Sequence, residues 1–375
     1  MEKVISVGPG QSQHACPGSA ICAKDFDASS NQSSQIPVNT ELPPGIQEHL
    51  WAIVLAGGEG ERLRPLTEKW LGCHCPKQYC TFVGNRSMLE HTLDRTCQIV
   101  NPARVLTVVS CSHMKWLETG IVANIPGRVI KQPANLDTGP GIFLPATYIF
   151  AVDPAATILI FPSDHFIFPR ERFLKHIAEL ATLANRYTDQ IAMLGVKPDR
   201  AEADYGWIEP GQTCEPSVFE KSKNAARWVS AFREKPAADE ATKFLEKGYL
   251  WNTMIMAVRS GTLWKLGQQY FPEMMELFEV LKSALTDNAE EDRTEVALSS
   301  IYRRLRPQNF SRGLLQRAVG HTVVAPMDDV DWDDWGRPER IVDSLARIGR
   351  RPDFSFESLI SGGQSDVQNR TFANA

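Results

Sequence analysis

The sequence predicts an α/β protein with a Rossmann-like, doubly wound mixed sheet and a small appended lobe. In the first half of the chain, short apolar runs rich in β-branched residues alternate with segments of helical periodicity, which is typical of parallel strands joined by helices. The second half keeps its apolar runs at less regular spacing, which predicts mixed strands. The folded region of about 300 residues exceeds the usual size of a single core, so a lobe beside the main sheet is expected.

The predicted order begins close to Trp51. Residues 1–48 are rich in Ser, Gln, Pro, Gly and Asn and have almost no periodic apolar spacing, so we expect a disordered leader. Residues 49–350 form the predicted folded domain. Residues 351–375 turn polar, with few apolar anchors, and are expected to be a flexible tail.

The elements of the domain follow in chain order. The first strand is the apolar run WAIVLA, which stops at two glycines and is typical of a buried parallel strand. Further apolar runs predict the other strands, so that the full set is 51–56, 105–110, 129–132, 157–162, 191–196, 228–232 and 250–258. Apolar residues that recur at three and four positions predict the helices 88–100, 142–150, 238–247 and 273–285, with a charged connector at 286–295.

Composition and charge exclude several classes of protein. The 375 residues are 43% hydrophobic and 23% charged, which suffices for a large core. The formal charge of -5 disfavours a generic nucleic-acid binder or a polybasic membrane protein, because those partners need a positive surplus. Eight unevenly spread cysteines favour reduced thiols, and no apolar run approaches the roughly 18 residues that span a bilayer. We expect an unprocessed cytoplasmic protein without nucleic-acid or membrane partners; homo-oligomerisation stays open.

The stretch AGGEGERLRPLT, residues 56–67, follows the first strand directly. Its glycines allow close backbone approach, so that successive amides can wrap a phosphate, while Arg62 and Arg64 supply positive charge. Leu63 breaks the dinucleotide-binding fingerprint, and no Gly-Lys-Ser/Thr completes a P-loop. The stretch therefore predicts a polyphosphate-binding loop, and a tight turn that merely needs glycine is the alternative.

This loop and the Pro76-Lys77-Gln78 that follows it resemble the signature of the sugar-phosphate nucleotidyltransferases. Six further motifs resemble the mannose-1-phosphate guanylyltransferases of that family, namely QPANLDTGP (132–140), FPSDH (161–165), YGWIEPG (205–211), FREKP (232–236), LWNT (250–253) and DWDDWG (331–336). The resemblance covers residues 50–345 and implies the nucleotide-diphospho-sugar transferase fold. Six motifs in the same order make a chance match implausible.

The resemblance implies a reaction in which a sugar 1-phosphate oxygen attacks the α-phosphorus of a nucleoside triphosphate and pyrophosphate leaves. Two cations are implied as catalytic residues, Arg62 toward the leaving phosphates and Lys77 toward the α-phosphate. The implied nucleotide-binding residues are Ala56, Gly57, Gly58, Gly60, Asn135, Thr138 and Gly139. The implied sugar-phosphate residues are Gly206, Glu234, Lys235 and Asn252. Solvated surface charges and an ordinary strand edge are the alternative roles for these residues.

A Mg²⁺ site is the predicted cofactor site. Asp164 comes just past an apolar strand, at the carboxyl end where open α/β sheets place their ligand crevice. Mg²⁺ prefers one or two carboxylates with phosphate oxygens and water, so a second acid is expected from elsewhere. The family pattern places it at Asp334, with Asp333 as the rival, while His165 is interpreted as a packing or hydrogen-bonding residue.

The sequence departs from the family pattern at three places. Residues 68–75 lengthen the loop before Pro76, Met254 replaces a usual glycine, and Arg64 replaces a common tryptophan. The long loop contains Cys73, His74 and Cys75, with Cys80 beyond it, but their spacing does not match a zinc pattern, so free thiols are preferred.

The preferred function is a Mg²⁺-dependent transferase that makes GDP-mannose from mannose 1-phosphate and GTP. A uridylyl- or thymidylyltransferase acting on glucose 1-phosphate is the enzymatic alternative. A catalytically silent nucleotide-sugar sensor is the alternative from another class, but Arg62, Lys77, Asp164 and Asp334 are all present. An NAD-dependent oxidoreductase is disfavoured because of Leu63.

Overall fold

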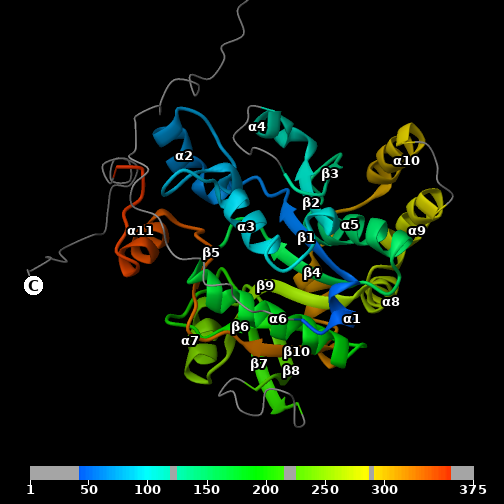
Figure 1. The fold of residues 1–375 in the computed structure, drawn as a ribbon. Coiled ribbons are helices and arrows are strands. Elements are labelled where there is room, and N and C mark those ends of the chain that lie inside the picture. Colours follow the sequence, from blue (N-terminus) through cyan, green and yellow to red (C-terminus); the bar gives the residue numbers. More distant parts are fainter. Residues whose placement is uncertain (1–41, 119–124, 215–224, 287–290, 356–375) are drawn as a thin grey trace, which may run out of the picture.

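The computed structural model describes residues 42–118, 125–214, 225–286 and 291–355. A mixed sheet runs through the molecule (Figure 1), and its strands in spatial order are β3 (Arg128–Gln132), β2 (Val105–Ser110), β1 (Leu50–Ala56), β4 (Thr157–Pro162), β9 (Leu250–Arg259), β6 (Ile191–Val196), β10 (Thr322–Pro326), β8 (Arg227–Glu234) and β7 (Gly206–Thr213). From β3 to β4 neighbouring strands are parallel, whereas β9 is antiparallel to β4 and β6. The sheet therefore has a parallel half and a mixed half.

Helices cover both faces of this sheet. The helices are α1 (Pro44–Gln47), α2 (Arg64–Leu71), α3 (Met88–Thr96), α4 (Met114–Glu118), α5 (Thr138–Val152), α6 (Arg170–Arg186), α7 (Ala238–Glu246), α8 (Ser260–Tyr270), α9 (Pro272–Thr286), α10 (Glu291–Arg304) and α11 (Pro338–Arg347). Ala52 and Val54 of β1 join one core with α3 and α6, while Ile53 joins a second core with α5, α8 and α9. This arrangement confirms the doubly wound α/β prediction.

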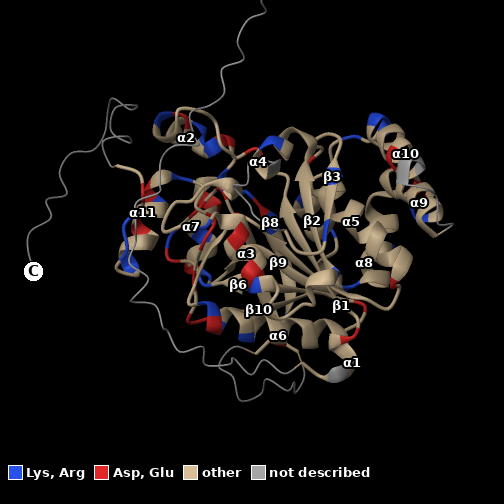
Figure 2. Ribbon diagram, turned by 45° about the horizontal axis from the view of Figure 1, so that its top comes forward, with Lys and Arg blue, Asp and Glu red and all other residues tan. Residues whose placement is uncertain are grey.

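A small lobe lies beside the main sheet (Figure 1), around α2, α11 and the two-stranded antiparallel sheet of β5 (Phe166–Phe168) and β11 (Asp331–Asp333). Aromatic rings hold it together: Phe166 stacks on Trp335 with ring centroids 4.9 Å apart, and Phe82 meets Trp335 edge to face at 5.6 Å. Figure 2 shows acidic and basic residues side by side on α11, whereas the strands of the main sheet carry few charges.

Several predicted boundaries were wrong. Leu42, within the predicted leader, is buried in the core, and Phe354, within the predicted tail, packs against Trp70 with ring centroids 5.6 Å apart. Both ordered ends were missed because a single apolar residue gives no periodic signal. Residues 1–41 and 356–375, the rest of those two predictions, lie outside the described residues.

Other corrections concern the helices. The long loop predicted over 68–75 is helical up to Leu71, and helix α2 has Pro65 in its first turn, where proline is tolerated. Helix α5 begins at Thr138 rather than at 142, with Asp137 accepting a hydrogen bond from the Thr138 N–H at 2.6 Å. Its first residues, Thr-Gly-Pro-Gly, obscure the helical pattern. The predicted helix over 88–100 ends at Thr96, and the predicted connector becomes helical again at Glu291.

Candidate active site

The glycine loop lies at the carboxyl end of β1, beside the carboxyl end of β4. Gln78 fastens it, because its Nε2 donates to the carbonyls of Ala56 at 2.9 Å and Gly58 at 2.8 Å. Gly60 has a φ of +68°, and a Cβ there would lie 2.8 Å from the backbone N of Lys77. The glycine is needed because the loop and the Pro76-Lys77 segment touch each other at this position.

Glu59, between these glycines, is braced from outside the loop. One of its carboxylate oxygens lies 3.2 Å from Nε2 of buried His113, and the other accepts a hydrogen bond from Ser112 at 3.3 Å. His74 contacts the Glu59 carbonyl at 2.8 Å. The sequence analysis missed these braces, because His113 and Ser112 come from the turn after β2 and belong to no recognised motif.

Lys77 and Arg62, the predicted catalytic cations, each contact a predicted metal ligand. Lys77 is buried, with its Nζ 2.8 Å from Oδ2 of Asp164 and donating to the backbone carbonyl of Asp334. Arg62 is half-exposed, with its Nη2 2.8 Å from Oδ2 of Asp334. Segments far apart in the sequence therefore bring two cations and two carboxylates together, as the predicted site requires.

Of the two carboxylates, Asp334 accepts more hydrogen bonds than Asp164. Its Oδ1 accepts hydrogen bonds from the Tyr205 hydroxyl, from Nη1 of Arg340 and from the backbone N–H of Gly336, each at 2.8 Å. Its Oδ2 accepts from Arg62. Burial alone would raise the pKa of Asp334, but the charges of nearby cations outweigh it and lower that pKa.

Asp333, the rival for the second metal site, is placed differently. Its carboxylate contacts Arg200 at 3.0 Å and the backbone N–H of Trp335 at 2.7 Å, and neither Asp333 nor Asp334 lines the cavity described below. Burial and the neighbouring charge of Asp334 raise its pKa. In this structure Asp333 supports the turn before Trp335, whereas Asp334 contacts Arg62.

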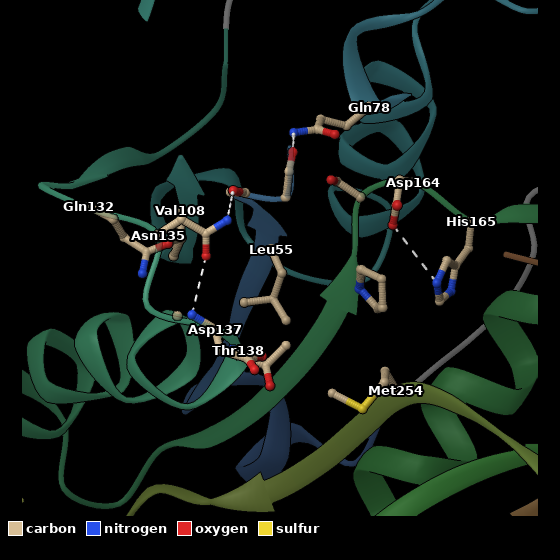
Figure 3. Close-up of a pocket in the computed structure, with 15 residues that line it drawn as sticks. Leu55, Gln78, Val108, Gln132, Asn135, Asp137, Thr138, Asp164, His165 and Met254 are labelled. Carbon is tan, nitrogen blue, oxygen red and sulfur yellow. Dashed lines mark hydrogen bonds and ion pairs between the residues drawn. The ribbon is translucent and has the colours of Figure 1, made fainter. Parts of the chain in front are cut away.

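A cavity of about 310 Å³ opens beside the glycine loop (Figure 3). It is lined by Leu55, Gly57, Gly58, Gln78, Val108, Gln132, Asn135, Asp137, Thr138, Gly141, Pro162, Ser163, Asp164, His165 and Met254. Asn135 and Thr138, both predicted for the nucleotide, line it. Gly139 does not: a Cβ there would lie 2.6 Å from the backbone carbonyl of Gln308, so this glycine is needed for packing.

Gln132 was not singled out in the sequence analysis, although it begins the motif QPANLDTGP. Its side chain lines the cavity and donates to the hydroxyl of Tyr302 at 3.1 Å. A Cβ at Gly57 would lie 2.7 Å from the Gln132 Oε1, so the first loop glycine admits this side chain. Its place as the last residue of β3, beside the ends of β2 and β1, is the signal that could have found it.

The residues predicted for the sugar phosphate gather on the mixed half of the sheet. A Cβ at Gly206 would lie 2.8 Å from Oε2 of Glu234 and 3.2 Å from the Cβ of Asn252, so these three residues meet closely. Burial raises the pKa of Glu234. Lys235, by contrast, is exposed at a φ of +49° and contributes a backbone hydrogen bond to Tyr205.

Met254 lies between the residues that line the cavity and the residues predicted for the sugar phosphate. It has a φ of +57°, which explains why glycine suits this position, and its side chain lines the cavity. Its N–H donates to Oδ1 of Asn252 at 3.0 Å, which fixes the orientation of that buried side chain.

The residues present fit a divalent cation at Asp164. This carboxylate lines the cavity and its side chain is 34% exposed, with Oδ1 3.8 Å from Nε2 of His165. Burial lowers the pKa of His165 to about 4, so the imidazole is neutral at pH 7, and its Nδ1 accepts from Trp332 at 3.2 Å. No three His, Cys, Asp or Glu side chains of the described segments converge on a possible metal position. A bound cation would therefore depend on oxygens supplied by a ligand.

The cysteines near Lys77 are buried free thiols. Cys75 and Cys80 flank it in sequence, and each Sγ lies within 3.7 Å of the Pro76 carbonyl oxygen. The hydrogen bond with Cys75 and burial raise the pKa of Cys80. These thiols therefore support the turn that presents Lys77.

Comparisons with known proteins identify the family of the chain. A family model described as nucleotidyl transferase matches residues 51–350. The mannose-1-phosphate guanylyltransferase of Escherichia coli strain K12 is 26% identical over 300 residues, which is 77% of this chain and 58% of that protein. The chain thus spans less than two thirds of this relative's length.

Solved structures show the same fold. A crystal structure described as mannose-1-phosphate geranyltransferase, from Thermus thermophilus, has a TM-score of 0.63 and 25% identity, covering 80% of this chain and 79% of that one. One described as mannose-6-phosphate isomerase, from Helicobacter pylori, has a TM-score of 0.57 and 17% identity, covering 76% and 99%, and supports the fold alone. Within the described residues, no helix is both long and apolar enough to cross a membrane.

Proposed function

Because the chain belongs to the nucleotidyl transferase family, as its motifs predicted, we propose that it joins a nucleoside triphosphate to a sugar 1-phosphate and releases pyrophosphate. The preferred pair in this proposal is GTP with mannose 1-phosphate. The observation that supports it most is the pairing of Lys77 with Asp164, which lines the cavity beside the glycine loop, together with the pairing of Arg62 with Asp334, whose carbonyl accepts from the same Lys77. The similarity to mannose-1-phosphate guanylyltransferases supports the substrate pair.

The reaction needs no covalent nucleophile from the protein. An oxygen of the sugar phosphate forms a bond to the α-phosphorus, the bond from that phosphorus to the bridging oxygen breaks, and pyrophosphate leaves with the electron pair. The protein's task is to align two polyanions and to stabilise charge in the transition state. Backbone amides of the glycine loop would hold the phosphates, Lys77 would contact the α-phosphate, and Arg62 the leaving phosphates.

A divalent cation such as Mg²⁺ would bind at Asp164 and neutralise phosphate charge. Lys77 would remain beside it, because its Nζ is fixed between Asp164 and the Asp334 carbonyl. Burial removes water from Lys77, so its charge acts at short range with little screening. On the other side, Glu234 and Asn252 would accept and donate hydrogen bonds to sugar hydroxyls, and Lys235 would pair with the sugar phosphate.

Pyrophosphate release across a matrix of nucleoside triphosphates and sugar 1-phosphates tests this function. GTP with mannose 1-phosphate is expected to give the highest kcat/KM. A clear preference for UTP or dTTP with glucose 1-phosphate would overturn the substrate assignment and keep the reaction class. Nucleotide-sugar binding without turnover of any pair would instead identify a non-catalytic sensor.

A further inference from the structure

The two oxygens of the Asp334 carboxylate lie in very different surroundings. Oδ1 is held by three donors, and two of them, Tyr205 and Arg340, are themselves buried. Arg340 is in turn paired with Glu202, so this side of the carboxylate is fixed by a connected network. Oδ2 is held by Arg62, which comes from the glycine loop and is not part of that network.

Arg62 is the contact that can be released most easily. Its side chain is 51% exposed, whereas that of Arg340 is only 7% exposed. Its guanidinium lies on the backbone of Gly336, where a Cβ would come within 2.3 Å of Nη1. Because Arg62 is bordered by glycine backbone and solvent, it can leave Asp334 without opening the core, and the carboxylate stays in place.

We propose that Arg62 masks the second carboxylate of the metal site in the nucleotide-free protein, and that a bound triphosphate unmasks it by drawing Arg62 away. This proposal rests on the proposed function, since it assumes that the leaving phosphates bind Arg62. Oδ2 of Asp334, no longer held by Arg62, then becomes available to a divalent cation together with Asp164. Nucleotide and metal thus bind with positive coupling, and each strengthens the other by the same factor.

Masking by Arg62 favours an order of binding in which the nucleotide and the cation bind together and the cation alone binds weakly. In the free protein, Lys77 and Arg62 neutralise the two carboxylates that a cation would need. A triphosphate offers Arg62 a more highly charged partner and at the same time brings the phosphate oxygens that complete the metal's coordination. A cation without nucleotide finds one carboxylate that is partly available and one that is masked.

Binding of Mn²⁺ to the nucleotide-free protein, measured by electron paramagnetic resonance, tests the mask without any turnover. Arg62→Ala is expected to tighten Mn²⁺ binding roughly tenfold, within the range of known coupling effects. The double variant Arg62→Ala with Asp334→Asn is expected to lose that gain. The matched control is Arg337→Ala, because Arg337 is 56% exposed and pairs with Asp204 at 2.8 Å but does not contact Asp334. Equal Mn²⁺ affinity of Arg62→Ala and Arg337→Ala would overturn the proposal.

A reciprocal measurement tests how the Arg62–Asp334 contact affects the affinity for the nucleotide. With EDTA present, Asp334→Asn is expected to bind GTP several-fold more tightly than the wild type, because Arg62 no longer has to leave a carboxylate. Asp333→Asn is the control, since it makes the same change at a neighbour that contacts Arg200 instead. If both variants bind GTP like the wild type, the masking proposal is wrong, even when the wild type catalyses the proposed reaction. If the Mn²⁺ result holds but no substrate pair reacts, the proposed function fails and the mask stands.

Discussion

The acidic side chains associated with the parallel and mixed halves of the main sheet differ in their ion pairs and in the direction of their pKa shifts. In the parallel half, which carries the glycine loop, Asp164 is paired with Lys77, and the nearby Asp334 with Arg62; both acids have lowered pKa values. In the mixed half, burial raises the pKa of Glu234, and no Lys or Arg among the described residues forms an ion pair with it.

The two acids near the glycine loop are thus each paired with a cation, whereas Glu234 shares a hydrogen bond with Ser311 and forms no ion pair among the described residues. A transition-state contact benefits from a cation that is fixed before the substrate arrives, as Lys77 is between Asp164 and the Asp334 carbonyl, because no reorganisation is then needed. Glu234 already shares a hydrogen bond with Ser311, and under the proposed function a sugar hydroxyl would add a further hydrogen bond to its buried carboxylate. We therefore expect losses in the parallel half to lower kcat and losses in the mixed half to raise KM.

The largest expected effect is that of Asp164→Asn. This change removes the cavity-facing carboxylate at the predicted metal position, so kcat is expected to fall roughly 10²-fold or more. Asp331→Asn is the matched control, because Asp331 begins β11, which pairs with the strand that follows Asp164, and its carboxylate lies 3.5 Å from Arg347. Steady-state pyrophosphate release measures both variants, and equal turnover of the two would remove Asp164 from the reaction.

Glu234→Gln is expected to raise the KM for the sugar phosphate roughly tenfold with a smaller change in kcat, since one hydrogen-bond acceptor for the sugar is weakened in ground state and transition state alike. The KM for the nucleotide should stay within about twofold. A variant with lowered kcat and normal KM would contradict the division between the two halves.

The same substitution gives a pH-dependent change in stability. The pKa of Glu234 is raised in the folded state, so ionisation of this buried carboxyl costs stability above the folded pKa and costs nothing below the unfolded value of about 4.3. Glu234→Gln is therefore expected to raise the melting temperature by about 2 °C at pH 8 and by less at pH 4. Thermal unfolding at both pH values measures this, and a stabilisation that grows toward low pH would reverse the assigned sign.

The smallest expected effect concerns Met254 at the boundary between the halves. Met254→Gly relieves a left-handed backbone, whereas Met254→Ala keeps it, so the glycine variant is expected to be the more stable by about 1 kcal/mol. Both variants remove the same side chain from the cavity wall. Chemical unfolding measures the difference, and an alanine variant at least as stable as the glycine variant would argue against the backbone explanation.

The sequence predicted the parallel half well because its strands are long apolar runs and its motifs follow them directly. Asp164 comes just after β4, and the segment that leads through α2 to Lys77 begins at the end of β1, so both segments start from the carboxyl ends of neighbouring parallel strands. The network around Asp334 could not be predicted in this way. Arg340 lies on α11 and Tyr205 on a turn before β7, and only tertiary packing brings them to the same carboxylate.

The missed elements have a similar explanation. Strands β5 and β11 are three residues each, which is too short for a periodic signal. Their pairing matters for the site, because Phe166 lies opposite Asp333 and the next residues along, His165 and Asp334, therefore lie at the same end of this small sheet. Met254 was recognised as a departure from glycine, but its left-handed backbone needed the structure. Residues such as His113, which contacts the glycine loop through Glu59, belong to no motif of their own.

The two lysines test the division most directly, since one belongs to each half. With GTP and mannose 1-phosphate, Lys77→Ala is expected to lower kcat roughly 10²-fold or more with a smaller change in KM. Lys235→Ala, at an exposed position, is expected to act mainly through the KM for the sugar phosphate. The measurement is the pair of steady-state kcat and KM values for both variants in one assay. If Lys77→Ala changes only the sugar-phosphate KM, or changes nothing, the assignment of the chemistry to the parallel half is contradicted.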